Sequence, residues 1–560
     1  MLKFSQQPIE AKLESLHSDA EERDAERRAL VEGLPYLDVK HQAVDVGALE
    51  IIPEALAKEA KAAIFAKDGN KIKVVAYSSK TSAFEKLILF IDEQKLKKEI
   101  HITSMSGLKE VWRHYLSIRP ENQVEIVSEI ALSEDALKSS KDIKTIEAAS
   151  GDIGQIDAET STTDALVKVL IDALTLKVSD VHLEPGRGGV QLRYRVDGIL
   201  YDIARISEEV GRRIVGRLKL LASLKLNIKD QPQDGRFTIK RFNGEDVEAR
   251  LSIVPSEFGE AVVMRVLDPS VVDLNMADLG LREDDLTIIQ TFLKEANGMI
   301  LVTGPTGSGK TTTLYAFLKH NSSPEVKIIT IEDPIEYHID GIQQTQVRPK
   351  ENYTFASGLR SILRQDPDMI LVGEIRDSET ATTAIDAALT GHLVFSTLHT
   401  NNAPGAIPRL VDLKAKVSSL ASALRLVVAQ RLVRKLCDRC KHPVAISEEL
   451  KTKINALKGQ LPQRVKLLNQ FKLYENVGCS FCNGGFEGRV GIFELLTFDE
   501  EMAEILGKDT SEVKVRRAAR AKGMVYMQED GILKALSGIT TIEEVEKVTG
   551  PVNWPVSSVE

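Results

Sequence analysis

The sequence predicts a multidomain α/β protein whose largest part is built on a mostly parallel sheet. In the second half of the chain, short apolar runs alternate with helical stretches, as expected of strands that are buried on both faces of such a sheet. One of these runs leads into a glycine-rich loop and then into a helix. At 560 residues the chain is long enough for about three to four domains, and its four cysteines form two Cys-x-x-Cys pairs.

The composition is that of an ordinary globular protein. Hydrophobic residues make up 43% and charged residues 28%, which excludes collagen-like and wholly disordered chains. The formal net charge is −9 with no dominant basic run, so we do not expect nucleic acid as the primary partner. No stretch approaches the roughly 18 consecutive apolar residues of a membrane span, and the charged N-terminal residues lack the apolar core of a secretory signal. We therefore expect a cytoplasmic protein that contacts a membrane only through partners.

The N-terminal part is predicted to hold a charged arm and a small domain. Residues 1–33 have sparse apolar positions, so we expect a solvated helical arm, with a partner-binding helix as the alternative. Residues 34–118 are predicted to form a small α/β domain. Within it, Ile72–Tyr77 and Leu87–Ile91 are expected to be strands or buried segments, and Pro53–Ala66 a helix.

A linker is predicted between this domain and a second one. Residues 119–160 are rich in Ser, Glu, Lys and Ala, which favours a linker that is partly helical. A mixed α/β domain is predicted over residues 161–273, beginning with a helix from Thr162. Its strands are expected at Val190–Val196, Phe237–Ile239 and Val262–Val266.

The core of the protein is predicted over residues 274–433. Its buried strands are expected at Met299–Thr303, Val326–Ile331, Met369–Val372 and Leu393–Leu398. The rest of the chain is divided into a segment that holds the cysteines, a helical C-terminal part and a tail, at residues 434–495, 496–548 and 549–560.

The loop after the first core strand matches the phosphate-binding pattern G-x-x-x-x-G-K-[ST]. The matching residues are Gly304, Pro305, Thr306, Gly307, Ser308, Gly309, Lys310 and Thr311, and Thr312 follows them. Glycines let such a loop adopt positive φ and bring backbone N–H groups against phosphate oxygens, and the following helix adds its positive N-terminal end. Lys310 is therefore expected to reach the β- and γ-phosphates of ATP, and the Thr311 hydroxyl to bind Mg²⁺. A chance glycine turn is the alternative, and the strand-to-helix register argues against it.

Acidic residues follow the next two core strands. Glu332, Asp333 and Glu336 come at the end of one strand, at the edge where open α/β sheets bind ligands. Carboxylates there can hold the water shell of a metal ion or orient an attacking water, and solvated loop acids are the alternative. Glu374 ends the other strand, and it is our candidate for the catalytic or magnesium-linked acid, with Glu336 as the second candidate.

Two histidines bracket the fourth core strand. His392 precedes the strand and His399 follows it. We interpret them as γ-phosphate sensors or interface residues, and ordinary structural histidines are the alternative.

The spacing of the cysteines, C-x₂-C-x₃₈-C-x₂-C, is typical of a metal site. The residues are Cys437, Cys440, Cys479 and Cys482. Four thiolates suit a tetrahedral Zn²⁺, whereas disulfides are disfavoured in a reducing compartment. Because four thiolates leave no open coordination position, we expect a structural zinc, with an insertion between the two pairs.

Together these motifs resemble the secretion ATPases of type II secretion and type IV pilus assembly. GPTGSGKTTTLY, ITIEDPIEY, LRQDPDMILVGEIRD and TGHLVFSTLHTNNA look like that family's Walker A, aspartate box, Walker B and histidine box, in the same order. Upstream, SDVHLEP, LRYRVDG, QPQDGR and GEAVVMRVLD resemble the domain that precedes the ATPase core. The resemblance is dense over residues 160–545 and weaker over residues 34–118.

The resemblance implies a RecA-like P-loop NTPase core that hydrolyses ATP to drive assembly of a pilus or pseudopilus. It also implies a homo-hexamer that docks on an inner-membrane platform protein, at the cytoplasmic face of that membrane. It places in the nucleotide site Lys310, Thr311, Glu332, Asp333, Glu336, Glu374, His392 and His399. It adds Arg250 and Arg265 from the preceding domain, of which ordinary surface ion pairs are the alternative role. Arg360 and Arg364 stand four residues apart in the core, so they are expected to share a helix face toward the site, and a solvated basic face is their alternative. A guanidinium always carries charge and can fork onto a phosphate.

Two other functions share part of these features. A retraction or conjugation-type motor has the same motifs, but the cysteine site and residues 34–118 argue against retraction, and the acidic charge argues against a DNA translocase. A nucleotide-binding scaffold that does not hydrolyse ATP is disfavoured because Lys310, Thr311 and Glu374 are all present.

Overall fold

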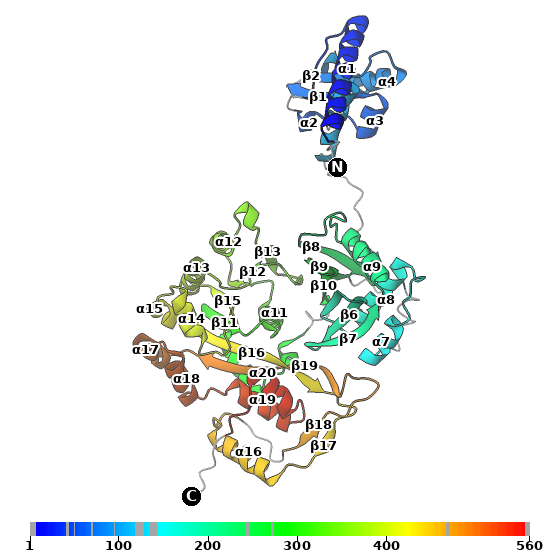
Figure 1. Ribbon diagram of the computed structural model, residues 1–560. Coiled ribbons are helices and arrows are strands. Elements are labelled where there is room, and N and C mark those ends of the chain that lie inside the picture. Colours follow the sequence, from blue (N-terminus) through cyan, green and yellow to red (C-terminus); the bar gives the residue numbers. More distant parts are fainter. Residues whose placement is uncertain are drawn as a thin grey trace. The chain divides into compact units, whose positions relative to one another are not determined.

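The computed structural model describes residues 7–40, 44–49, 51–68, 71–93, 96–117, 128–133, 143–241, 246–269, 274–465 and 471–554 (Figure 1). The chain divides into two compact units, residues 1–126 and 127–560, and each is described by itself. Among the described residues, no helix combines the length and the apolar character needed to cross a membrane.

The first unit is a small α/β domain around a three-stranded sheet. Strands β1 (Ala62–Asp68) and β2 (Lys71–Ala76) are antiparallel, and β2 runs parallel to β3 (Lys97–Ile102). Helix α4 (Ser82–Glu93) connects the parallel pair. The other helices are α1 (Gln7–Glu32), α2 (Val46–Leu49), α3 (Glu54–Glu59), α5 (Met105–Arg113) and the 3₁₀ turn η1 (His114–Ser117).

The helix expected at Pro53–Ala66 is wrong beyond Glu59. The apolar run that follows is buried as strand β1, with Ala62, Ala63 and Ile64 fully inaccessible. Packing in a sheet therefore outweighs the helix propensity of its alanines. The segment Leu87–Ile91 packs in the apolar core, but it lies in α4 and not in a strand.

Helix α1 is charged, yet its C-terminal half packs on its own unit. Ala25 and Ala29 are buried. The Arg28 guanidinium stacks over the Tyr77 ring at 3.8 Å from the ring centroid. Ser79 donates hydrogen bonds to the Glu32 carboxylate from both its backbone N–H and its hydroxyl. This half of the expected solvated arm is therefore part of the small domain, because one face of the helix finds apolar and hydrogen-bonding partners there.

The second unit begins with a seven-stranded sheet, which we call the preceding domain together with its helices. Its strand order is β4-β8-β9-β10-β5-β6-β7. The strands are β4 (Glu129–Ala131), β5 (Asp180–Gly186), β6 (Gly189–Val196), β7 (Ile199–Ile206), β8 (Gln233–Lys240), β9 (Asp246–Ser256) and β10 (Gly259–Leu267). The helices that cover it are α7 (Ile146–Ile153), α8 (Thr162–Thr175) and α9 (Glu208–Leu221). Strands β6, β8 and β10 include the three strands that the sequence predicts in this region.

The linker predicted at residues 119–160 is partly built into this domain. Residues Glu129–Ala131 form β4, which pairs in parallel with β8, and α7 packs on β7. Ile130, Ile146 and Ile153 are buried in the same apolar core as the sheet. Residues 118–127 and 134–142 lie outside the described residues. The few isoleucines of this mostly polar segment form too weak a periodic pattern for the sequence to predict that it packs on the sheet.

The core of the second unit is another seven-stranded sheet, in the order β13-β12-β14-β15-β11-β16-β19. All neighbours in it are parallel except the pair β16 and β19. The strands are β11 (Gly298–Thr303), β12 (Ile328–Glu332), β13 (Gln343–Gln346), β14 (Met369–Val372), β15 (Leu393–Leu398), β16 (Leu424–Leu436) and β19 (Phe486–Thr497). The helices are α10 (Glu283–Phe292), α11 (Lys310–Asn321), α12 (Phe355–Ile362), α13 (Ser378–Leu389), α14 (Ala406–Asp412) and α15 (Val417–Ala423), and the 3₁₀ turns are η3 (Met276–Leu279), η4 (Pro349–Glu351) and η5 (Leu363–Gln365). Figure 1 shows the C-terminal helices beside β16 and β19.

The cysteines lie at an insertion between β16 and β19. It contains a two-stranded sheet of β17 (His442–Val444) and β18 (Leu473–Glu475) and the helix α16 (Glu448–Gln460). The segment predicted at 434–495 therefore includes most of β19, which belongs to the core sheet. The chain then ends in α17 (Glu500–Lys508), α18 (Glu512–Ala521), α19 (Met527–Leu536) and α20 (Ile542–Thr549).

Candidate nucleotide site and cysteine cluster

The glycine-rich loop runs from β11 into α11 and lies against β16. Gly307 and Gly309 have φ of 77° and 85°, in the left-handed region that favours glycine. A Cβ on Gly309 would lie 2.9 Å from the Gln430 side chain of β16, and one on Gly304 would lie 2.4 Å from the Gln430 carbonyl oxygen. The glycines are therefore required both by the turn and by the close approach of the loop to its neighbouring strand.

Lys310 folds back over this loop. Its Nζ donates hydrogen bonds to the carbonyl oxygens of Gly304 at 2.9 Å and Pro305 at 3.1 Å. Burial lowers the pKa of Lys310, while the nearby charges of Glu374 and Glu336 act in the opposite direction. The hydroxyl of Ser308, in the same loop, is buried and has no hydrogen-bond partner among the described residues.

Parallel strands bring the other predicted residues to the same edge of the sheet. Strands β11, β12, β14 and β15 all end there, and the acids and His399 follow them. A cavity of about 870 Å³ opens at this edge. Of the predicted residues, those that line it are Arg265, Thr306, Gly307, Ser308, Gly309, Lys310, Thr311, Thr312, Glu332, Asp333, Glu336, Glu374 and His399.

Glu374 follows β14 and is held by two basic side chains. Arg376 lies 2.5 Å from one of its carboxylate oxygens, and Nε2 of His399 lies 3.5 Å from the other. Burial lowers the pKa of His399, and the charge of Lys310 acts in the same direction, while the Glu374 carboxylate acts against both. The Glu374 side chain is only 14% exposed, yet it lines the cavity.

Glu332 has a different environment from Glu374. It is the last residue of β12 and is 4% exposed. Its carboxylate accepts hydrogen bonds from the hydroxyls of Tyr315 and Thr330 and from the amide of Gln344. Burial raises the pKa of Glu332, although these donors act against that shift. Glu332 therefore lines the cavity with its oxygens already engaged by donors within the chain.

The two histidines lie at opposite ends of β15. His399 follows the strand, at the cavity. His392 precedes it, so six strand residues, about 20 Å, separate the two. Nδ1 of His392 lies 3.1 Å from the carbonyl oxygen of Ala387 in α13. The structure therefore does not bring His392 to the predicted site.

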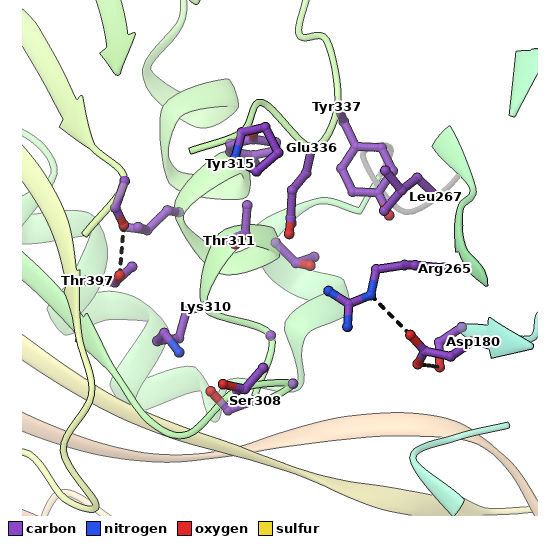
Figure 2. Close-up of a pocket in the computed structure, with 18 of the residues that line it drawn as sticks. Asp180, Arg265, Leu267, Ser308, Lys310, Thr311, Tyr315, Glu336, Tyr337 and Thr397 are labelled. Carbon is purple, nitrogen blue, oxygen red and sulfur yellow. Dashed lines mark hydrogen bonds and ion pairs between the residues drawn. The ribbon is translucent and has the colours of Figure 1, made fainter. Parts of the chain in front are cut away.

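The four candidate arginines also separate into different environments. Arg265 of β10 lines the cavity, its Nε donates to Asp180 of β5 at 3.1 Å, and Figure 2 shows its guanidinium pointing toward the loop. Arg250 of β9 instead donates to the carbonyl oxygen of Ile335 and does not border the cavity.

Arg360 and Arg364 lie at the solvent-exposed end of α12 and on η5. Arg360 pairs with Glu379 of α13 at 2.5 Å, and Arg364 donates to the Arg360 carbonyl oxygen at 2.9 Å. Neither borders the cavity in this chain. Their observed contacts are those of an ordinary basic helix face.

Some cavity residues were missed by sequence reasoning. Asp180, Arg376, Arg489 and Tyr337 all line it. Arg376 had a usable signal, since it stands two residues after Glu374 in the same motif. Asp180 stands in the quoted segment SDVHLEP, but nothing in that segment shows that it meets Arg265, which depends on the antiparallel register of β5 and β10.

The four cysteines come together in one cluster. Their sulfur atoms all lie within 4.8 Å of one another, with Cys440 and Cys482 3.7 Å apart and Cys479 and Cys482 3.6 Å apart. A tetrahedral zinc with Zn–S distances of about 2.3 Å places its sulfurs about 3.8 Å apart. These separations fit such an ion, and they are far longer than a disulfide bond.

Comparisons with known proteins agree with the fold and with the motifs. The family model described as Type II/IV secretion system protein matches residues 156–547. A type II secretion system protein E of Dickeya dadantii is 45% identical over 382 residues, which cover 68% of this chain and 74% of that protein. A type IV pilus assembly ATPase of Myxococcus xanthus is 35% identical over 528 residues, which cover 93% of this chain and 89% of that protein.

A solved structure has a similar fold over much of the chain. The ATPase DotB of Legionella pneumophila superposes with a TM-score of 0.53 and covers 70% of this chain and 98% of its own. The sequence identity is 22%, so this likeness concerns the fold alone.

Proposed function

Since the chain belongs to the type II/IV secretion system protein family, we propose that it hydrolyses ATP to drive assembly of a type IV pilus or of a type II secretion pseudopilus. The observation that supports this most is the composition of one cavity. Lys310, Glu336 and Glu374 border it from the core, and Arg265 borders it from the preceding domain. Figure 2 shows Lys310, Glu336 and Arg265 around this cavity.

The glycine-rich loop would bind the phosphates of ATP. Lys310 would exchange its hydrogen bonds to the carbonyl oxygens of Gly304 and Pro305 for bonds to β- and γ-phosphate oxygens. The partnerless hydroxyl of Ser308 is available as a further donor in the same loop. Magnesium held at the Thr311 hydroxyl, with Glu336 acting through water, would neutralise charge on the phosphates.

Glu374 would act on the attacking water. A carboxylate at this place can orient the water and accept its proton as the bond from the γ-phosphorus to the β–γ bridging oxygen breaks, giving ADP and phosphate. Arg376 and His399 would hold the carboxylate in orientation. Arg265 would stabilise the charge that develops on the transferred phosphoryl group.

The cysteine cluster would hold one structural zinc ion. The sulfur separations fit tetrahedral coordination, and four thiolates leave no position for a substrate. We further propose that six copies assemble into a ring and that the ring acts at the cytoplasmic face of the inner membrane through a platform protein. Membership of the family supports this assembly.

Phosphate release by purified full-length protein tests the activity. The wild-type protein should release phosphate from ATP with magnesium, and Lys310→Ala should abolish release because the loop loses its charge on the phosphates. Near-normal release by Lys310→Ala would reject the assigned role of the loop. ATP binding without any release by the wild type would instead favour a nucleotide-binding scaffold.

A further inference from the structure

A short segment that begins within the second cysteine pair contacts the preceding domain. Residues 481–489, which we call the joint segment, begin inside this pair and run into β19 of the core sheet. Two parts of the preceding domain meet the joint segment: the start of α7 and the turn between β6 and β7. The segment therefore lies between the cysteine cluster and the domain that supplies Arg265 to the cavity.

The first contact caps helix α7 from outside its own domain. The Asn483 side-chain oxygen accepts a hydrogen bond from the Ile146 N–H at 3.0 Å. Ile146 is the first residue of α7, and such N–H groups have no partner within the helix. Thr145 already caps the N–H of Ala148, so Asn483 satisfies a different group. Ile146 itself is 8% exposed, which makes a lost partner costly there.

The second contact consists of two cation–π interactions with the ring of Phe481. The Phe481 ring has the Lys144 ammonium 4.7 Å from its centroid and the Arg439 guanidinium 4.4 Å from it. Lys144 stands two residues before α7, and Arg439 lies inside the first cysteine pair. Cation–π contacts of this kind link the start of α7 to both pairs.

The third contact lies at the other end of the joint segment. The Gly488 N–H donates to the Asp197 carboxylate at 2.9 Å, and Arg489 lies 4.0 Å from the same carboxylate. Asp197 is in the turn between β6 and β7. This turn belongs to the same sheet as β5 and β10, which carry Asp180 and Arg265.

We propose that the cysteine cluster is a latch that holds the preceding domain in place over the glycine-rich loop. Cys482 directly precedes Asn483, whose backbone is paired with Phe486 by hydrogen bonds of 3.1 Å and 3.2 Å. A metal ion at the cluster fixes Phe481 and Asn483 and thereby the start of α7. The latch does not depend on ATP hydrolysis, and only the metal-removal part of its test rests on the proposed zinc.

Hydrogen exchange of the full-length protein, read by mass spectrometry without nucleotide, tests the latch. The Asn483→Ala variant should raise exchange of amides at the start of α7 about five- to tenfold, as expected for one lost hydrogen bond. Removing the metal from the wild type with a chelator should raise exchange at the same place. Val477→Ala is the matched control, because Val477 lies in the same insertion and is 61% exposed. It should leave α7 unchanged, and amides of β11 should stay protected in every sample.

Three results would overturn the proposal. Metal removal could raise exchange only within residues 437–489 and leave α7 as in the wild type. Val477→Ala could raise exchange in α7 as much as Asn483→Ala does. Loss of protection in β11 as well would mean that the protein unfolds generally, and not that the contact between the joint segment and α7 is lost. Because the readout needs no turnover, its failure is distinct from a failure of the proposed ATPase activity.

Discussion

Glu332 ends β12 and Glu374 follows the neighbouring parallel strand β14, but the two carboxylates have different environments. Glu332 accepts hydrogen bonds from three side chains and is buried. Glu374 borders the cavity between Arg376 and His399. Glu332 lines the cavity as well, but donors within the chain already occupy its oxygens. We therefore propose a catalytic role for Glu374 and a positioning role for Glu332, which contacts Tyr315 and Gln344.

A first prediction compares the same substitution at both positions. Glu374→Gln should keep ATP binding and lower the hydrolysis rate by about 10²–10⁴-fold, because an amide cannot accept the proton. Glu332→Gln should instead lower stability by about 1–3 kcal/mol, because its NH₂ group faces donors in a buried site. Phosphate release, ATP affinity and thermal unfolding should be measured for both variants. Parent-like hydrolysis by Glu374→Gln would make Glu336 the better candidate.

At the scale of single residues, the sequence predicts what is local. Lys310 and Glu374 are recognisable because each stands at a fixed position after a buried strand. Arg265 and Asp180 are 85 residues apart and become partners only through strand register. His392 illustrates the opposite case, since it lies near a motif in sequence but at the far end of a strand.

At the scale of elements, helix α8 carries a buried carboxylate, that of Asp172. Asp172 is 1% exposed, and neither of its oxygens has a hydrogen-bond partner among the described residues. Burial, with a smaller contribution from Asp152, raises the pKa of Asp172 from 3.8 to about 7. The unfolded chain therefore loses this proton at lower pH than the folded chain, so stability falls as pH rises from about 4 to about 7.

A second prediction follows for Asp172→Asn, which is neutral at every pH. The free energy of unfolding of the variant minus that of the wild type should be roughly 2–3 kcal/mol larger at pH 8 than at pH 5, because only the wild type has to bury a charge at pH 8. Calorimetric unfolding of both proteins at the two pH values measures this change. Any destabilisation that the amide causes equally at both pH values cancels when the two differences in unfolding free energy are compared. If the variant and the wild type differed in unfolding free energy by the same amount at pH 5 and at pH 8, the proposed ionisation of buried Asp172 would be contradicted.

A third prediction concerns the insertion between β16 and β19. Purified protein prepared without chelator should contain about one zinc ion per chain, because four thiolates complete one tetrahedral site. Cys437→Ser should lower the zinc content and loosen the insertion, since ligand loss removes a folding constraint. Elemental analysis and limited proteolysis measure the two effects. A zinc-free wild-type protein would reject the assignment.

The sequence predicts the core strands well and the peripheral elements poorly. Strands β11, β14 and β15 are short and mostly apolar runs, as expected for a parallel sheet that is buried on both faces. Strand β1 is rich in alanine, so its local preference is helical and only tertiary packing makes it a strand. Strand β4 is three residues long, too short for a periodic pattern to appear.

At the scale of the whole second unit, the nucleotide cavity needs two domains. The core supplies the loop and the acids, and the preceding domain supplies Arg265 on a strand braced by Asp180. Motifs in the sequence indicate both domains, but no pattern in a single chain shows which surfaces face each other. We therefore expect the rate of the proposed hydrolysis to depend on the position of the preceding domain, as it does in enzymes that close by domain motion.

Phosphate release and ATP affinity, measured together on the full-length protein, test this two-domain ATPase most directly. The wild type should release phosphate, and Arg265→Ala should lower kcat by about 10³-fold or more while ATP affinity changes little, because the arginine acts on charge that develops during transfer. Arg187→Ala, an exposed arginine of the same domain outside the cavity lining, should behave as the wild type. Hydrolysis by Arg265→Ala at the wild-type rate, or no phosphate release by the wild type, would contradict the proposed mechanism.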